Sequence, residues 1–207
     1  SVTYTNTGEK TDANNDKVKT QDVGDWKLIR NFTVAGDTAN NYDVTYVDGT
    51  STVTPAEIHL KLNDVSTTYG TAFDTSKYGY DASQLGMANG DSTDVVTKAI
   101  ANGDITYTNT GDGTDGKATN HAGTYELSGK TDKKLANYTV IVDDAKSIVE
   151  KADITLQLKD VSTTYGTPFD EKTYGYNQDT DYLKGILKNG DDASVVTDNI
   201  KNDAIHY

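Results

Sequence analysis

Three oxygen-bearing side chains stand at alternate positions near the start of the chain: Asp12, Asn14 and Asp16. This is the spacing of the first ligands of a calcium-binding loop, in which carboxylate and amide oxygens hold the ion. The later loop positions do not fit, because Lys17 replaces the required glycine and Val23 replaces the bidentate glutamate. Clusters of Asp and Asn are more often solvated turns, so we expect a turn here and keep calcium as the alternative.

Six tyrosines recur beside glycines and could form a ligand-binding surface. They are Tyr69, Tyr78, Tyr80, Tyr165, Tyr174 and Tyr176. Exposed aromatic rings could stack on the sugars of a host glycan. Buried, the same rings would fill a core, while the glycines would allow a positive φ or a bulge. The first three and the last three tyrosines each stand among the same structural landmarks of the sequence, which favours core packing over sugar binding.

No residues combine into a catalytic site, so we predict that the chain is not an enzyme and carries no cofactor. The histidines, His59, His121 and His206, are few and scattered, and serine lacks a nucleophile motif. The acidic pairs Asp143-Asp144 and Asp191-Asp192 fall in expected turns rather than in a cleft. There is no cysteine, which removes disulfides, thiolate ligands and thiol nucleophiles.

The composition narrows the choice of partners. A formal net charge of -13 repels nucleic acid and anionic lipid, and no run approaches the roughly 20 apolar residues of a membrane helix. Only 34% of the residues are hydrophobic, yet there are 14 tyrosines. We therefore expect a soluble piece with a thin, tyrosine-rich core, no nucleic-acid partner and no membrane insertion.

An internal repeat with a period near 100 residues organises the chain. Residues 56–80 return at 152–176, with 17 identities in 25 positions. Asn41-Tyr42 returns as Asn137-Tyr138, and Asn89-Gly90-Asp91 as Asn189-Gly190-Asp191. The segment VTYTNTG at 2–8 matches 105–111 and begins again at 205–207. The chain therefore holds about two periods.

Most of each period has the pattern of antiparallel strands. Ile58, Leu60 and Leu62 alternate with polar residues, and the same alternation returns at 154–158. Further strands are predicted at 2–7, 26–34, 42–47, 105–108, 123–127, 138–142 and 147–150. The pattern also predicts that a strand continues through each join, from 51–53 to 58 and from 147–149 to 154, which favours a stiff connection.

Short helices interrupt the strands. Ser92 as N-cap, an apolar stripe over Val95, Val96, Ala99 and Ile100, and a stop at Asn102-Gly103 predict one helix, with a second copy around 195–200. Tyr182, Leu183, Ile186 and Leu187 predict another. The expected fold is mainly β, a β-rich α+β class: tandem antiparallel β-sandwich or β-grasp-like modules with one or two short helices each, forming an elongated rod.

The order of these landmarks resembles the MBG-type (YGX) repeats of bacterial surface adhesins, including filamentous haemagglutinin-like proteins. The resemblance rests on Tyr69-Gly70, Tyr165-Gly166, the two Asn-Tyr pairs and the Thr-Val-Thr-Pro-Ala join at 52–56. The second join lacks the proline, and Trp26 replaces the expected tyrosine. The resemblance implies an extracellular location on a bacterial surface and a role in adhesion or in projecting an adhesin, and it implies no catalytic residue.

The resemblance also sets the expected module boundaries. It makes 57–153 one complete repeat, with 1–56 the C-terminal part of one repeat and 154–207 the N-terminal part of another. Because a half-module cannot bury its apolar face, the alternatives are units of 1–103 and 104–207, or completion by neighbouring molecules. The expected partners are neighbouring repeats of the parent chain, and a host glycan, mucin or protein if the module binds ligands.

Overall fold

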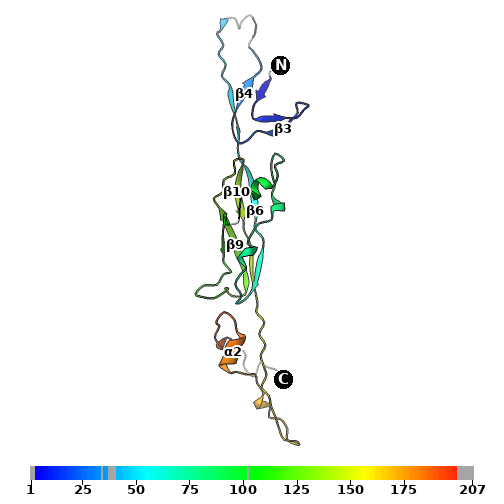
Figure 1. Cartoon of the computed structure of the whole chain (residues 1–207), viewed down its shortest axis with the longest axis vertical. Helices are drawn as coiled ribbons and strands as arrows, with labels where there is room; N and C mark the ends of the chain where they lie inside the picture. The colour runs from blue at the N-terminus through cyan, green and yellow to red at the C-terminus, as the bar shows by residue number, and fades with distance from the viewer. Residues whose placement is uncertain (1–2, 34, 37–40, 102, 200–207) are drawn as a thin grey trace. The chain divides into compact units, whose positions relative to one another are not determined.

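The structure of the chain is a computed structural model that describes residues 3–33, 35–36, 41–101 and 103–199. It is mainly β, with 34% of residues in strands and 13% in helices, which confirms the predicted class. Figure 1 shows the strands in the part of the chain before residue 151 and the helix α2 after it. Among the described residues, no helix has the length and apolar character that crossing a membrane requires.

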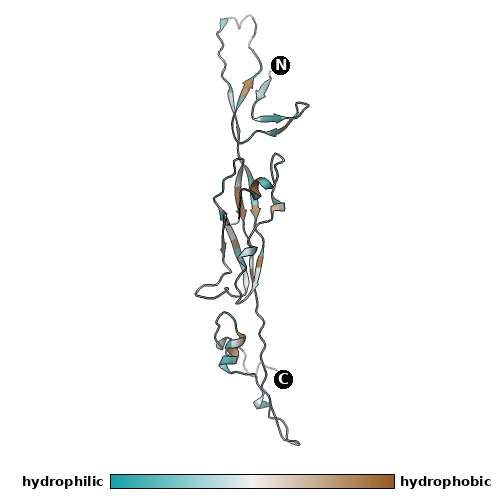
Figure 2. Ribbon diagram, in the orientation of Figure 1, coloured by the Kyte–Doolittle hydropathy of each residue, from teal (hydrophilic) through white to brown (hydrophobic). Residues whose placement is uncertain are grey.

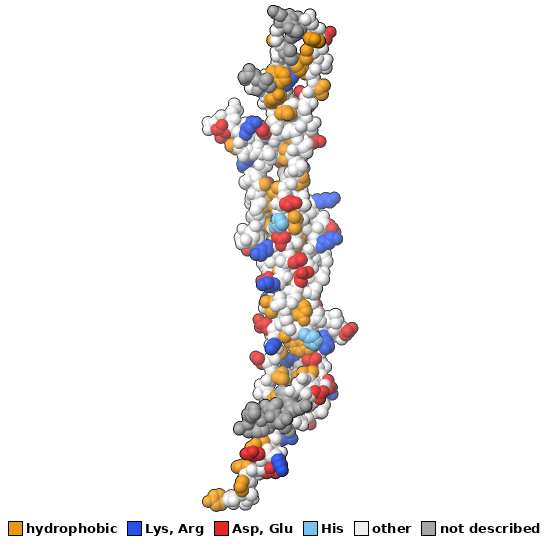
Figure 3. Space-filling view, turned by 180° about the vertical axis from the view of Figure 1, so that it is seen from behind, with side chains coloured by type: hydrophobic (Ala, Val, Ile, Leu, Met, Phe, Trp, Pro, Cys, Tyr) orange, Lys and Arg blue, Asp and Glu red, His pale blue; other side chains and the backbone are white. Residues whose placement is uncertain are grey.

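The described residues fall into two compact units. The first takes its residues from 1–62, 80–106 and 129–143, and the second from 63–79, 107–128 and 144–207. Each unit therefore contains residues from two copies of the sequence repeat. Acidic and basic side chains are interspersed on the face that Figure 3 shows.

An antiparallel sheet and a hairpin begin the first unit. The sheet has the order β1-β4-β5, formed by β1 (Tyr4–Asn6), β4 (Gly24–Arg30) and β5 (Gly49–Val53). The hairpin joins β2 (Glu9–Thr11) to β3 (Lys17–Thr20). Trp26 of β4 pairs with Ser51 of β5.

A parallel pair of strands supplies buried side chains to the first unit. β6 (Ala56–Lys61) pairs with β10 (Tyr138–Asp143), so that Tyr138 faces Ala56 and Val140 faces Ile58. Ile58 and Leu60 of β6 are buried, as their alternation predicted. Figure 2 shows hydrophobic residues on both strands. The 3₁₀ turn η3 (Ala82–Gln84) and the one-turn helix α1 (Asp94–Thr97) complete the unit, and Val96 is buried.

A mixed sheet dominates the second unit. Its order is β7-β11-β9-β8, from β7 (Val65–Thr68), β11 (Ala145–Glu150), β9 (Gly123–Thr131) and β8 (Ile105–Asn109), the last two strands continuing into the first unit. β11 pairs in parallel with β7 and antiparallel with β9. The short 3₁₀ turns η2 (Thr75–Lys77) and η4 (Glu171–Thr173) each follow an N-cap aspartate whose side chain accepts a backbone N–H.

A small apolar cluster lies near the end of the described chain. Tyr176, Leu183, Ala193 and Val196 form its buried centre, and Leu156 packs against it. Leu183 comes from α2 (Thr180–Ile186) and Val196 from α3 (Ser194–Thr197), and Ala193 stands immediately before α3. Asp179 caps α2 by accepting a hydrogen bond from the Tyr182 backbone N–H at 2.9 Å.

Several predictions from the sequence are wrong in detail. The sheets are not purely antiparallel, because β6·β10 and β7·β11 are parallel. Parallel strands need a long crossover connection, and alternation of apolar residues within a strand does not reveal its direction. The predicted strands at 42–47 and 154–158 are not formed. Neither segment has a neighbouring strand among the described residues, and a strand exists only through its partner.

The helix predicted over 92–100 and its second copy are shorter than expected, whereas α2 forms where Tyr182, Leu183 and Ile186 predicted a helix. α1 covers one turn. The Ser92 hydroxyl accepts a hydrogen bond from the Asp94 backbone N–H at 3.2 Å, two residues further along the chain. Val95 points outward, with 45% of its surface exposed. The predicted positions Val2, Val34, Asn102, Ile200 and 205–207 lie outside the described residues. The module boundaries inferred from the repeat remain a prediction.

Candidate functional site

Two Asn-Gly-Asp turns, one in each sequence copy, are the centres of the polar contacts that hold loops from distant parts of the chain. Asn89 and Asn189 have φ of 55° and 58°, and the following Gly90 and Gly190 have φ of 70° and 72°. Asparagine tolerates the left-handed region better than most residues, and glycine adopts it freely. The Asn-Gly sequence therefore builds the same turn in both copies.

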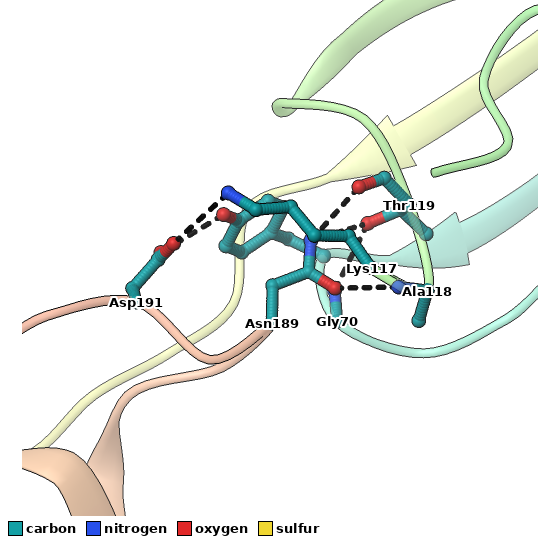
Figure 4. A network of polar contacts seen from close by, with 7 residues as sticks. Gly70, Lys117, Ala118, Thr119, Asn189 and Asp191 are labelled. Atoms are coloured by element: carbon teal, nitrogen blue, oxygen red, sulfur yellow. Dashed lines mark hydrogen bonds and ion pairs between the residues drawn. The ribbon is translucent and has the colours of Figure 1, made fainter. Parts of the chain in front are cut away.

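The side chain of Asn189 binds the backbone of the loop that contains Thr119 (Figure 4). Its Oδ1 accepts a hydrogen bond from the Ala118 backbone N–H at 2.8 Å, and its Nδ2 donates to the Thr119 carbonyl oxygen at 2.8 Å. Thr119 is fully buried. One amide side chain thus satisfies both a backbone donor and a backbone acceptor at the part-buried end of this loop.

Asn89 makes the corresponding contact with Thr20. Thr20 and Thr119 occupy matching positions in the repeat, because each stands three residues before the landmark that begins at Val23 or Ala122. The Thr20 backbone N–H donates to Asn89 Oδ1 at 3.3 Å, and Asn89 Nδ2 donates to the Thr20 carbonyl oxygen at 3.3 Å. These bonds are longer and more exposed than those of Asn189.

Tyr69-Gly70 forms the other side of the Asn189 turn. The Tyr69 hydroxyl donates to Asp191 Oδ2 at 2.8 Å, and Lys117 Nζ lies 3.7 Å from Asp191 Oδ1. Burial raises the pKa of the Tyr69 hydroxyl, and its bond to the Asp191 carboxylate raises that pKa too, although Asn189 acts in the opposite direction. The phenol therefore stays protonated and keeps donating at neutral pH.

Gly70 allows the backbones to approach closely. Its φ is +83°, its N–H donates to Thr119 Oγ1 at 3.0 Å, and a Cβ at this position would lie 2.5 Å from Lys188 Cβ. Any other residue would therefore meet both backbone strain and a clash. This close approach explains the glycine of the Tyr-Gly motif at this position.

Tyr138 and Asn137 make a second set of contacts around the Asn89 turn. The Tyr138 hydroxyl donates to Asp91 Oδ2 at 2.7 Å, and burial raises its pKa. Asn137 Oδ1 accepts from the Val23 backbone N–H at 3.0 Å. The Asn-Tyr pair thus links the Asn-Gly-Asp turn to the loop that follows Thr20.

The six candidate tyrosines do not share one environment. Tyr176 is fully buried, and the other five range from half-buried to the completely exposed Tyr165. The Tyr78 hydroxyl accepts a hydrogen bond from Asn109 Nδ2 at 2.8 Å. A fully buried ring cannot stack on a ligand, which removes Tyr176. Of the other five, Tyr69 lines two hollows and Tyr165 is completely exposed.

Two hollows border Tyr69. The larger, about 360 Å³, is lined by Tyr69, His121, Ala122, Lys151, Ala152, Asp191 and Val195. The smaller, about 200 Å³, is lined by Tyr69, Thr114, Asp115, Lys117, Thr119, Asn120 and His121. The rings of Tyr69 and His121 are nearly parallel, with an interplanar angle of 14° and centroids 6.4 Å apart. Aromatic faces beside polar groups could receive a sugar.

The calcium candidate lies in the turn of the β2–β3 hairpin. Asp12 Oδ1 accepts hydrogen bonds from the backbone N–H groups of Asn14 at 2.8 Å and Asp16 at 3.0 Å. Asn15 has a φ of 64°, as tight turns require. The carboxylate of Asp12 therefore already stabilises the turn. Across the part of the chain that the structure describes, no group of three or more His, Asp or Glu side chains could hold a metal.

The other histidines and acidic residues considered as catalytic candidates do not come together in one site. His59 Nδ1 lies 3.0 Å from Asp143 Oδ2 on the exposed face of the β6–β10 pair, and this contact raises the pKa of His59. Asp191 belongs to the Tyr69 contacts, whereas Asp192 accepts the Ser194 backbone N–H at 3.0 Å before α3. His206 lies outside the described residues.

Sequence reasoning missed the two asparagines and the two threonines. The signal that could have found them was the recurrence of Asn-Gly-Asp in both copies, which marks a repeated turn geometry but not its partner. Comparisons of the chain with protein-family models, with curated proteins and with solved structures found no match.

Proposed function

We propose that the chain is a structural segment of a bacterial surface adhesin, in which consecutive β-rich repeats are locked end to end and project the adhesin from the cell. In this proposal the repeats are extracellular and form an elongated stalk. The contacts of the two Asn-Gly-Asp turns act as the locks between consecutive repeats. Stiffness, rather than catalysis, is the useful property.

The observation that carries the proposal is the same lock in both copies. Asn89 and Asn189 use both polar atoms of their side chains on the backbone of matching threonine loops. In the expected module phase, each contact joins one repeat to the next. An amide that satisfies a donor and an acceptor together fixes orientation more strongly than a single hydrogen bond does.

The short join between strands supports the same function. β5 ends at Val53 and β6 begins at Ala56, so only Thr54 and Pro55 lie between them. The Ala56 backbone N–H donates to the Asn137 carbonyl oxygen at 3.0 Å. Proline restricts φ and a two-residue link has little freedom, so bending at this join is limited.

Small-angle scattering on proteins with one, two or three added copies of residues 57–153 tests the proposal. The maximum dimension is expected to grow by a constant increment for each copy. Replacing the lock asparagine by alanine in every copy is expected to reduce that increment, because the joins then bend. A particle whose dimension grows as that of a compact globule would contradict the proposal.

A second candidate function is glycan binding, favoured by the stacked Tyr69 and His121 rings beside the 360 Å³ hollow. A glycan array with the 207-residue chain tests it. Binding that is lost in His121→Ala but kept in Tyr165→Ala would support a site at this hollow. An array without hits would remove this candidate.

A further inference from the structure

Two parallel strand pairings, one in each unit, lie within residues 56–150, which are called the central module below. β6 pairs with β10, and β7 pairs with β11. Together they join residues 56–68 to residues 138–150, two segments that the sequence separates by about 80 positions.

The chain contains a second copy of each segment. The copy of the first segment lies near the C-terminal end of the sequence, and the copy of the second lies nearer its N-terminal end. Residues 152–164 repeat 56–68, and residues 42–54 repeat 138–150, both at a shift of 96. In the structure, 152–157 and 42–48 form no strands. β5, which repeats β11, is an edge strand of the sheet β1-β4-β5, whereas β11 lies between β7 and β9.

Residues 152–164 already resemble one half of a module. Leu158 forms a bridge with Tyr176, as Leu62 does with Tyr80 in the first copy. The Lys159 backbone N–H donates to the Gly175 carbonyl oxygen at 2.8 Å, which matches the bond from Asn63 to Gly79 at 2.9 Å. One edge of this segment is therefore bonded as in the complete module, and the other edge has no strand beside it among the described residues.

The apolar side chains show what the missing strands would cover. Ile154 is 40% exposed where Ile58 is 1% exposed, and Leu158 is 53% exposed where Leu62 is 3% exposed. In the other segment, Tyr42 is 71% exposed. Its counterpart Tyr138 is 5% exposed. Identical or similar side chains are thus buried in the complete module and exposed in the separate halves.

We propose that the chain assembles head to tail with a second copy of itself, residues 152–164 of one chain adding as parallel strands to residues 42–54 of the other. The register of β6·β10 and β7·β11 sets the register of this pairing. It places Val44 opposite Ile154, Tyr46 opposite Leu156 and Ser51 opposite Val161. This proposal rests on the proposed repeat function and names the partner that closes the two half-modules.

The same register predicts how salt affects assembly. It places Asp43 opposite Asp153 on the outer face, where the central module has Thr139 opposite Glu57. Like charges at directly opposed positions weaken strand pairing, and each chain also carries a net charge of -13. Assembly is therefore expected to strengthen at about 0.5 M salt and in the variant Asp43→Asn.

Sedimentation velocity on the 207-residue chain tests the proposal. At about 0.5 M salt, the mass is expected to rise from 22.3 kDa as the concentration increases from about 1 µM to about 1 mM. Val44→Asp and Ile154→Asp each place a charge on the face to be buried, so each is expected to weaken assembly at least about tenfold. Val47→Asp is the matched control, because Val47 is 90% exposed and the proposed register places it on the other face.

Mixing the two broken variants gives the sharpest result. Val44→Asp retains an intact 152–164 segment, and Ile154→Asp retains an intact 42–54 segment. An equimolar mixture is expected to form one-to-one dimers of twice 22.3 kDa and no larger species, because the remaining ends cannot pair. Thermal unfolding of each variant confirms that the central module, which contains neither substitution, is folded.

A disulfide trap measures the register directly. The chain has no cysteine, so a mixture of Thr45→Cys and Thr155→Cys offers only these thiols. Directly opposed residues in neighbouring strands are close enough for a disulfide, and a mixed dimer is expected under mild oxidation. A chain that remains a monomer throughout the concentration range, or a Val47→Asp variant as defective as Val44→Asp, would overturn the proposal. The scattering test of the stalk uses covalently joined repeats, so its outcome stays independent.

Discussion

Gly70→Ala tests whether the Tyr-Gly motif is shaped by the turn that lies against it. The new Cβ would lie 2.5 Å from Lys188 Cβ, closer than two non-bonded carbon atoms can approach. The turn at Asn189 must then move away from Gly70. Its bond with the Ala118 backbone N–H, now 2.8 Å long, is expected to weaken, so the Ala118 amide reports the effect.

The size of the effect follows from the cost of overpacking. An extra carbon in a filled site costs about 1–3 kcal/mol. Since each 1.4 kcal/mol changes an equilibrium about tenfold, the Ala118 amide is expected to exchange with solvent about 5 to 150 times faster. Hydrogen exchange followed by NMR measures this rate for a single amide.

Two controls separate the clash from backbone strain. Gly166 has a φ of +87° and no atom within 4 Å of the place that a Cβ would take, so Gly166→Ala shares the strain of about 1–2 kcal/mol without the clash. It should leave the Ala118 rate unchanged. Adding Lys188→Gly to Gly70→Ala removes the colliding carbon and should restore much of the protection. If the double variant exchanges as fast as Gly70→Ala, the clash is not the cause.

Three further predictions concern other contacts. Tyr138→Phe removes the hydroxyl bound to Asp91 and should destabilise the protein by about 1–3 kcal/mol, measured by chemical denaturation. Asp143→Asn should lower the pKa of His59 towards 6.5 in an NMR titration, because the carboxylate now raises it; the pair stabilises the fold below pH 6.5 and loses this effect as pH rises through the raised pKa. Asp12→Ala should destabilise the β2–β3 hairpin, and calcium should not change the melting temperature of either protein.

A specific result would contradict each of these three predictions. Tyr42→Phe, at an exposed ring, is the control for Tyr138→Phe and should change stability by less than about 0.5 kcal/mol; equal effects would discount the Asp91 bond. An unchanged His59 titration in Asp143→Asn would refute the assigned contact. A calcium-dependent rise in melting temperature that Asp12→Ala abolishes would reinstate the metal site.

Local patterns predicted the strands and turns whose partners are present. The alternation of Ile58, Leu60 and Leu62 correctly identified a half-buried segment. The identical alternation at 154–158 failed, because a strand needs a hydrogen-bonded neighbour that periodicity cannot supply. Strand direction failed for a similar reason, since it depends on the crossover between β6 and β10.

The candidate site was less predictable than the fold. Tyr69 was identified from its place beside glycine, but its bond to Asp191 spans 122 positions in the sequence. Nothing local marks Thr119 as the residue that Asn189 binds. Such contacts depend on where whole loops lie in space, and a single sequence carries no measure of that distance.

The parallel pairing of β7 with β11 also decides how the second unit responds to pulling. Tension applied before β7 and after β11 would draw the two strands in opposite directions along their shared axis. The hydrogen bonds between them would then be sheared together instead of breaking one after another from an end. Strands joined in this way resist extension by force even where their thermodynamic stability is modest.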